Sequence, residues 1–451
     1  MATDLPERAP VRRRIAAIGA LVAALASIAL IVQATAANIG GVIVSLLGLA
    51  VTVGAGWHAL VRRGLVRTLS VIVALAALAV VVWGLVLGDF SLARGAAIIV
   101  TTAIAVGLAR VALGRTEADI AARVEAMPSA PRARRPVLLM NPRSGGGKVE
   151  RFHLEDECRA RGIEPIVLQP GDDLLELAEA AVARGADVIG MAGGDGSQAL
   201  VASIATKHDV AHVVVPAGTR NHFALDLGLD RDDVVGALEA YTDGLERRID
   251  LATVNGRIFV NNASMGLYAK IVQSPEYRDA KVQTVLSMLP DLLGPDAVPM
   301  DLRFVGPDGE QQTSAHMLLV SNDPYRLDEP NARGTREHLD AGTLGIVSLQ
   351  VNTAADAQQL IALNTVGQIA RFPGWLEWSD PAFQVESGGP VEVGVDGEAM
   401  SLDPPLEFHS IPGALRVRTP RKAPGVSPAT RATNPWALED LIKIAVGTRS
   451  S

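Results

Sequence analysis

Long apolar runs dominate the first quarter of the chain, and few charged residues interrupt them. A helix of about twenty residues, rising about 1.5 Å per residue, crosses the roughly 30 Å apolar core of a bilayer. The pattern therefore predicts about four transmembrane helices within residues 1–113, followed by a juxtamembrane linker at residues 114–136. The four runs span Ile15–Ala37, Ile39–Val61, Leu69–Gly88 and Leu92–Leu108.

Basic residues at the ends of these runs predict their orientation. Arg12–Arg14, Arg62–Arg63 and Arg110 lie at alternate ends of the runs, whereas the two intervening loops contain no Lys or Arg. By the positive-inside rule, both ends of the segment then face the cytoplasm. We therefore expect a multi-pass anchor in the cell (plasma) membrane, with the remainder of the chain on the cytoplasmic side.

Short apolar runs alternate with helical stretches between residues 137 and 248. Each run has the length of a buried strand, and strands alternating with helices predict a right-handed α/β unit with a parallel sheet. The expected strands are Val137–Met140, Ile163–Leu168, Ala186–Met191 and His212–Pro216, and the expected helices lie at about 149–161, 172–183 and 198–204.

From Ile249 the pattern changes to short alternating strands with hairpin turns, among them Asn255-Gly256. This change predicts a second, β-rich domain at residues 249–400. Residues 401–420 are expected to return to the α/β domain, and residues 421–451 to form a tail with an amphipathic stretch. The predicted fold class is α/β plus β, behind a four-helix transmembrane segment.

Charge and cysteine content narrow the function. With a net charge of -8 and a pI near 5.6, the chain does not have the balance of a nucleic-acid binder, and no nucleic-acid partner is expected. Its single cysteine, Cys158, excludes a disulfide within the chain and a cysteine-rich metal site.

Glycine-rich polar turns follow three of the expected parallel strands. They read Asn-Pro-Arg-Ser-Gly at 141–145, Gly-Gly-Asp-Gly-Ser at 193–197 and Pro-Ala-Gly-Thr-Arg-Asn at 216–221. Because the carboxyl ends of parallel strands meet at one edge of a sheet, we expect the three turns to converge on one crevice. Glycines let backbone N–H groups approach an anion, and a helix N-terminus attracts phosphate. The turns therefore predict a phosphate site.

Acidic residues lie in the second of these turns and in a fourth turn later in the chain. Asp195 would repel phosphate unless a divalent cation lies between them or unless it accepts a proton from an attacking hydroxyl. The spacing excludes a Walker-type P-loop, because Val149 follows Lys148 where Ser or Thr would bind magnesium. Asp396 and Glu398 lie in a Val-Asp-Gly-Glu turn of the β-rich domain, and spacing alone predicts that this turn faces water.

These four motifs, in this order, resemble the diacylglycerol kinase catalytic-domain family, which includes bacterial soluble lipid kinases and the sphingosine and ceramide kinases. The resemblance covers about residues 137–420. It implies that ATP binds between the α/β domain and a β-sandwich, together with Mg²⁺, and that a lipid enters the same cleft.

The resemblance also implies roles for individual residues. Asp195 would serve the magnesium and the triphosphate, Asp340 is a second candidate metal ligand, and Asp396 or Glu398 would accept the proton of the lipid hydroxyl. The implied contacts to ATP are Asn141, Arg143, Ser144, Gly145, Gly193, Gly194, Gly196, Ser197, Gly218, Thr219 and Asn221. The sequence departs from the family at three positions. His222 stands where the family usually has Asp, and Ser197 replaces Thr. Ala341 stands where the family often has the second acid of a structural magnesium site.

Three functions are open at this point. The favoured one is a membrane-anchored lipid kinase that transfers the γ-phosphate of ATP to a lipid hydroxyl, with diacylglycerol as the preferred acceptor and phosphatidic acid as the product. The alternatives are an NAD kinase, which also carries Gly-Gly-Asp-Gly, and a non-catalytic lipid-sensing protein on a kinase fold. The expected partners are a membrane lipid, the bilayer itself and a second copy of the chain.

Overall fold

The computed structural model describes residues 11–37, 39–61, 65–87, 92–113, 124, 127–266, 299–327, 334–353, 355–356, 359–360, 363, 368–421, 426–431 and 438–447. Most of the predicted juxtamembrane linker lies outside the described residues. Long helices occupy the positions of the four apolar runs, at α1 (Val11–Ala37), α2 (Ile39–Val61), α3 (Leu65–Leu87) and α4 (Leu92–Leu113).

Three of these helices contain apolar stretches long enough to cross a membrane, namely Val11–Ala34, Ile39–Gly56 and Ala93–Leu113. In α3 the apolar stretch is shorter, at Thr68–Trp83, so among the described residues the span predicted at Leu69–Gly88 falls below the length criterion. Large apolar side chains along all four helices are exposed, as lipid-facing side chains are. The helices indicate that the protein associates with a membrane.

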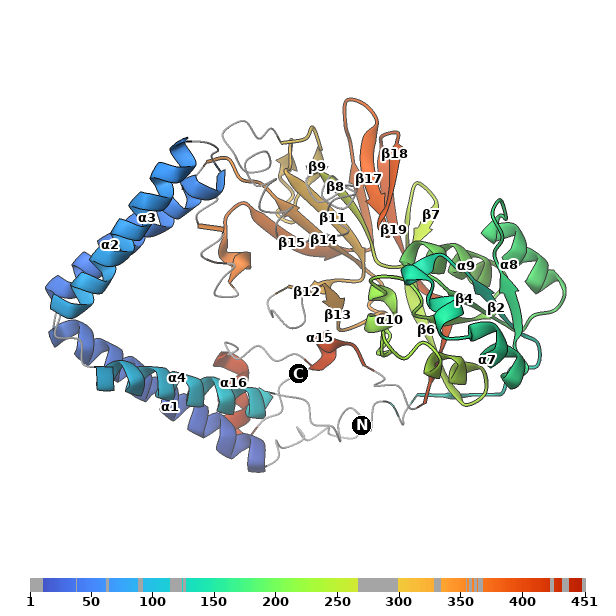
Figure 1. The fold of residues 1–451 in the computed structure, drawn as a ribbon, viewed down its shortest axis with the longest axis horizontal. Coiled ribbons are helices and arrows are strands. Elements are labelled where there is room, and N and C mark those ends of the chain that lie inside the picture. The colour runs from blue at the N-terminus through green and yellow to red at the C-terminus, as the bar shows by residue number, and fades with distance from the viewer. Residues whose placement is uncertain are drawn as a thin grey trace, which may run out of the picture.

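The long helices pack as two pairs, α2 with α3 and α1 with α4 (Figure 1). Between α1 and α4, the hydroxyls of Ser27 and Thr102 are 2.7 Å apart. The tail helix α16 (Leu438–Val446) lies against the same pair and buries Leu441 and Ile444 among alanines of α1 and α4. The amphipathic stretch of the tail therefore packs on the helices of the membrane segment.

A curled nine-stranded sheet, counted within the described residues, forms the centre of the remainder of the chain. Its main path runs β1-β6-β19-β5-β4-β2-β3, and β7 and β16 pair with β6 and β19. Strands β2 to β5 are parallel, and β5 is also parallel to β19. The bounds are β1 (Ser129–Ala130), β2 (Pro136–Met140), β3 (Glu164–Val167), β4 (Val188–Ala192), β5 (Ala211–Val215), β6 (Gly244–Val254), β7 (Arg257–Phe259), β16 (Ala382–Val385) and β19 (Leu406–Pro420).

The order of the parallel strands places a topological switch point between β2 and β4. From β2 the chain moves outward to β3 and then returns to β4 on the other side of β2. Ligands of open α/β sheets bind beyond the carboxyl ends of the strands at such a point. The first two glycine-rich turns leave β2 and β4 there, and the predicted α/β fold is confirmed.

Helices cover both faces of the parallel strands, because alternate strand residues point to opposite sides. Leu139 and Met191 pack under α8 (Leu174–Ala183) and α9 (Asp195–Lys207). Leu138 and Val213 pack under α7 (Leu154–Arg161) and the 3-10 helix η2 (Gly236–Tyr241). The short helices of this domain are η1 (Ser144–Gly146), α6 (Lys148–Arg151) and α10 (His222–Asp226).

One predicted helix differs from the structure. The single helix expected at about residues 149–161 is two helices, α6 and α7. The chain turns between them at His153, whose φ of 48° is left-handed and incompatible with a continuous α-helix. The turn allows Leu154 and Cys158 of α7 to reach the core beneath the sheet.

The second domain is a sandwich. Its six-stranded antiparallel sheet, counted within the described residues, has the order β15-β14-β11-β8-β17-β18 and packs on the far part of the first sheet. Strands β6 and β19 run through both domains, and a register shift between Ile411 and Leu415 of β19 accompanies the curl. The strands are β8 (Asn262–Gly266), β11 (Met317–Asn322), β14 (Leu344–Leu349), β15 (Trp375–Asp380), β17 (Val391–Val395) and β18 (Glu398–Leu402).

The remaining elements are short. Asn255 and Gly256 have φ of 48° and 80°, so the predicted hairpin between β6 and β7 is confirmed. The other bounds are β9 (Phe304–Val305), β10 (Gln311–Gln312), β12 (Tyr325–Arg326), β13 (Thr335–Arg336), η3 (Ile369–Arg371) and α15 (Pro428–Arg431).

Candidate active site

The three glycine-rich turns touch one another. A Cβ atom on Gly145, whose φ is +54°, would collide with the carbonyl oxygen of Ala217. A Cβ atom on Gly218 would lie 2.5 Å from the Cα of Gly194. The third turn therefore lies against both of the others, and it does so at positions where only glycine leaves the backbone enough room.

The first turn carries the basic side chains of the candidate site. The Asn141 side-chain oxygen accepts a hydrogen bond from the Arg143 backbone N–H (3.0 Å), and the Ser144 N–H donates to the Asn141 carbonyl (3.1 Å). Arg143 is exposed at the rim. Lys148 donates from Nζ to the Pro216 carbonyl (3.2 Å), which ties the first turn to the third.

The second turn opens helix α9, and Asp195 is its first residue. The two carboxylate oxygens of Asp195 accept hydrogen bonds from the backbone N–H groups of His222 (3.1 Å) and Phe223 (3.2 Å). Asp195 therefore joins the second glycine-rich turn to the N-terminal end of helix α10. Each oxygen retains acceptor capacity for a further partner, because a carboxylate offers about four acceptor sites. Gly193, Gly194, Gly196 and Ser197 surround it in the same turn.

The third turn is shaped by a buried amide. Asn221, with a φ of 52°, donates from its side chain to the carbonyls of Pro216 (3.0 Å) and Gly218 (2.9 Å). These bonds hold the turn in a closed shape. Thr219 at its tip is exposed.

Asp396 and Glu398, in the turn between β17 and β18, both lie close to the α/β domain. Asp396 is half-buried, and its carboxylate accepts hydrogen bonds from the N–H groups of three consecutive residues, 260 to 262, at 2.9, 2.8 and 3.2 Å. The Glu398 carboxylate pairs with Arg257 (3.1 Å), and a Cβ on Gly196 would lie 2.5 Å from its Oε1. Gly397 and Glu398 are exposed, as spacing alone predicted, and the same turn also lies beside the second glycine-rich turn.

Burial raises the pKa of Asp396 to about 7, with the Asp195 charge adding to the rise and the three backbone N–H groups opposing it. The neighbouring His222 has a pKa lowered by burial, against the opposing effect of the charges on Asp195 and Asp226. Near neutral pH, the acid at position 396 is therefore poised between its two protonation states.

Asp340 is exposed, and its carboxylate is 3.7 Å from Nδ1 of His338. Within the described residues, no three His, Cys, Asp or Glu side chains gather into a metal-binding group. Mg²⁺ is commonly held by one or two carboxylates together with substrate phosphates. A carboxylate such as Asp195, beside turns that offer backbone N–H groups to phosphate, fits that donor chemistry.

A buried ion pair that no sequence motif indicates lies beside the site. Arg336 and Asp226 have fully buried side chains, 2.7 Å apart. Asp226 lies in helix α10, which directly follows the third turn, so its position in the sequence indicates that it lies near the site. No sequence pattern pointed to Arg336, because 110 residues separate the two.

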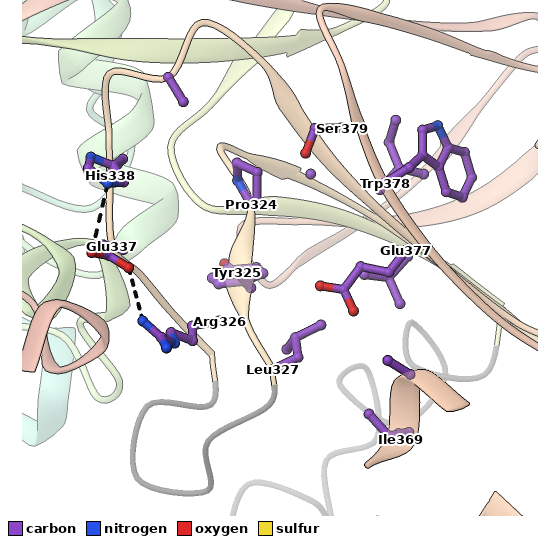
Figure 2. Close-up of a pocket in the computed structure, with 15 residues that line it drawn as sticks. Pro324, Tyr325, Arg326, Leu327, Glu337, His338, Ile369, Glu377, Trp378 and Ser379 are labelled. Carbon is purple, nitrogen blue, oxygen red and sulfur yellow. Dashed lines mark hydrogen bonds and ion pairs between the residues drawn. The ribbon is translucent and has the colours of Figure 1, made fainter. Parts of the chain in front are cut away.

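A cavity of about 680 Å³ opens in the β-rich domain beside β14 and β15. Figure 2 shows apolar side chains in its lining, among them Tyr325, Leu327 and Trp378. It also shows the carboxylate of Glu377 and, at one side, the ion pair between Arg326 and Glu337. The Tyr325 hydroxyl accepts a hydrogen bond from the Asn262 side chain (2.9 Å). The backbone N–H of Asn262 donates to the Asp396 carboxylate. One wall of the cavity is therefore linked to this acid through a single residue.

Comparisons with known proteins agree with the motifs. Residues 135–254 match the family model of the diacylglycerol kinase catalytic domain. The chain is 27% identical over 301 residues to a diacylglycerol kinase of Mycobacterium tuberculosis, across 63% of this chain and 94% of that one. It is 26% identical over 284 residues to a diacylglycerol kinase of Staphylococcus aureus, across 58% of this chain and 85% of that one.

The fold is also similar to a solved structure from Bacillus anthracis that was assigned to the diacylglycerol kinases. The TM-score is 0.51 at 19% sequence identity, and the match covers 64% of this chain and 98% of the other. At this identity the likeness concerns the fold alone.

Proposed function

Because residues 135–254 belong to the diacylglycerol kinase catalytic-domain family, we propose that the protein is a membrane-anchored kinase that transfers the γ-phosphate of ATP to a lipid hydroxyl. Diacylglycerol is the preferred acceptor, and phosphatidic acid is then the product. One observation carries the proposal. Acids of the β-rich domain lie beside a glycine-rich turn of the α/β domain, with Glu398 against Gly196 and Asp396 near Asp195.

The three turns would bind the phosphates of ATP. Their glycines leave backbone N–H groups accessible, and α9, with 13 residues, presents its positive end at the second turn. Arg143, exposed at the rim, and Lys148, which bridges two turns, supply positive charge. Phosphoryl transfer depends on such positioning and charge neutralisation more than on covalent chemistry by the protein.

Asp195 is the residue that would hold Mg²⁺ together with the triphosphate, and Asp340 is a second candidate ligand. Magnesium, when bound, neutralises charge that develops on the phosphate oxygens. Asp195 itself also keeps the second and third turns together through the N–H groups of His222 and Phe223. Its carboxylate therefore has a positioning task apart from any metal.

Asp396 is the proposed proton acceptor for the lipid hydroxyl, and Glu398 is the alternative. In the reaction the hydroxyl oxygen forms a bond to the γ-phosphorus, the bond from that phosphorus to the β,γ-bridging oxygen breaks, and ADP leaves. The hydroxyl proton passes to the carboxylate. A pKa of about 7 suits this task, because a base is most effective when its pKa is near the working pH.

The acyl part of the lipid is assigned to the cavity beside β14 and β15. A volume of about 680 Å³ is within the range of small-molecule sites, and the lining is largely apolar. The link from Tyr325 through Asn262 to Asp396 supports this assignment. A lipid acceptor does not leave the bilayer, so anchoring through four spans, with the kinase domain on the cytoplasmic side, would raise its effective concentration at the site.

A lipid-panel assay tests the proposal. The full chain is assayed in mixed micelles with Mg²⁺, γ-labelled ATP and, in separate reactions, diacylglycerol, ceramide, sphingosine or NAD. We expect labelled phosphatidic acid, and a loss of most of the label in Asp195→Asn, because phosphoryl transfer depends on positioning and charge neutralisation. Label on NAD alone would replace the proposal with the NAD kinase alternative. Nucleotide binding without any transfer would favour the lipid-sensing alternative.

A further inference from the structure

Arg336 is a fully buried arginine whose guanidinium donates four hydrogen bonds and makes one further ion-pair contact. Nε and Nη2 contact Oδ2 of Asp226 at 2.8 and 2.7 Å, and Nη1 donates to the carbonyls of Val260 (2.7 Å) and Asn322 (2.6 Å). Nη2 also donates to the side chain of Asn261 (2.9 Å). The guanidinium thus connects the α/β domain, through Asp226, with two segments of the β-rich domain.

One end of this connection leads to Asp396. The backbone of residues 260 to 262 donates three N–H hydrogen bonds to the Asp396 carboxylate. Arg336 holds the Val260 carbonyl and the Asn261 side chain of that same segment. Arg336 therefore holds in place the backbone segment whose N–H groups bind the Asp396 carboxylate.

The other end leads to Asp195. Asp226 is the last residue of the five-residue helix α10, and its carboxylate accepts from both the backbone N–H and the side chain of Arg336. The first N–H groups of the same helix, those of His222 and Phe223, donate to Asp195. Asp195 and Asp226 thus hold opposite ends of one short helix.

We propose that Arg336, paired with Asp226, is a positioning residue that sets the distance between Asp195 and Asp396 across the two domains. The inference rests on the proposed function. Stability alone explains the pair poorly, because a buried ion pair loses much of its Coulomb energy to desolvation, and apolar residues of similar volume are often equally stable. What an arginine adds is a rigid planar fork with fixed hydrogen-bond directions.

Arg336→Lys tests the proposal, because it keeps the charge and removes the fork. The matched control is Arg418→Lys, another buried arginine, which pairs with Glu246 at 2.7 Å and contacts neither acid. We expect kcat for lipid phosphorylation to fall at least 10-fold in Arg336→Lys and in Asp226→Asn, with the Kd of ATP changed less than 3-fold. Arg418→Lys should retain kcat.

The pH dependence of kcat distinguishes a positioning role of Arg336 from a simple loss of folded protein in the variant. Loosening residues 260 to 262 weakens hydrogen bonds to the Asp396 carboxylate, which raises the pKa of that group. The acidic limb of kcat should therefore move to higher pH in Arg336→Lys. A fall in kcat that matches the loss of folded protein, with the limb unmoved, would overturn the proposal.

Hydrogen exchange gives a readout that does not require activity. In Arg336→Lys we expect the amides of residues 222–223 and 260–262 to exchange at least 10-fold faster, whereas Arg418→Lys leaves them unchanged. Unchanged exchange would overturn the positioning role even if the wild-type chain phosphorylates lipid. Faster exchange in Arg336→Lys, together with a wild-type chain that phosphorylates no lipid, would refute the proposed function and leave the structural coupling standing.

Discussion

Gly218 and Gly194 meet backbone to backbone, so that a Cβ atom on Gly218 would lie 2.5 Å from the Cα of Gly194. Backbone atoms cannot move aside as a flexible side chain can. Gly218→Ala should therefore separate the second and third turns, with a loss of about 1–3 kcal/mol in unfolding free energy, as for other overpacked sites. We also expect ATP to bind at least 10-fold more weakly.

Thermal unfolding and ATP titration of the full chain measure both effects. The control is Gly389→Ala, because a Cβ atom there has open space around it and the backbone is not left-handed. Equal melting temperatures and ATP affinities for Gly218→Ala and the wild type would show that the two turns do not need this contact.

The pKa of Asp396 predicts the pH dependence of transfer. Since a proton acceptor must be ionised, kcat/KM should rise with pH and level off above a midpoint near 7. Asp396→Asn should remove this limb together with most of the activity, and Glu398→Gln should retain the limb. The opposite result for the two variants would assign the proton acceptor to Glu398.

Asp323 predicts a pH dependence of stability. Its Oδ1 accepts from the Ala341 N–H (3.1 Å), and among the described residues its buried Oδ2 has no hydrogen-bond partner. Burial, with the Asp250 charge added, raises its pKa from 3.8 to about 7. Because the folded-state pKa is the higher one, the contribution of Asp323 to stability is present below about pH 4 and is lost as the pH rises through 7.

Asp323→Asn removes the charge, and Asn tolerates the left-handed φ of 63° at this position. The variant should gain stability relative to the wild type as the pH rises from 4 to 7, reaching about 1–3 kcal/mol at pH 8, the usual cost of an unsatisfied buried group. Urea unfolding in EDTA at pH 5 and pH 8 measures this. A difference that does not change with pH would contradict the assignment.

The assignment of the cavity to the acyl chains predicts a selective defect. Ala370 is an exposed residue of its lining, so Ala370→Trp should fold and fill part of the space. We expect KM for diacylglycerol to rise about 10-fold while KM for ATP stays constant, because lost apolar contacts of this size are worth about 1–3 kcal/mol. Ala370→Ser is the control. An unchanged KM for diacylglycerol in Ala370→Trp would place the lipid elsewhere.

The sequence was informative where local chemistry determines structure. Glycines after apolar runs identified three turns, because few residues other than glycine let turns approach each other so closely, as at Gly145 and Gly218. The Asn255-Gly256 hairpin followed from the same kind of signal. Apolar run length identified the long helices. It also predicted four spans, whereas three of the described helices meet the length criterion and the apolar stretch of α3 is shorter.

The sequence was uninformative where contacts between distant segments determine structure. Spacing predicted that the Asp396 turn faces water, as Gly397 and Glu398 do, but it did not predict that N–H groups of residues 260 to 262 bind the Asp396 carboxylate. The left-handed residue at His153 broke a helix that periodicity made continuous. The Arg336–Asp226 pair joins positions 110 residues apart, and neither residue belongs to a motif.

A structure of the full chain with a non-hydrolysable ATP analogue tests the central claim most directly. We expect the three phosphates to contact backbone N–H groups of residues 141–147, 193–197 and 217–219, with Asp195 and Asp396 on opposite sides of the terminal phosphate. An analogue bound away from these turns, or bound through only one of them, would contradict the account.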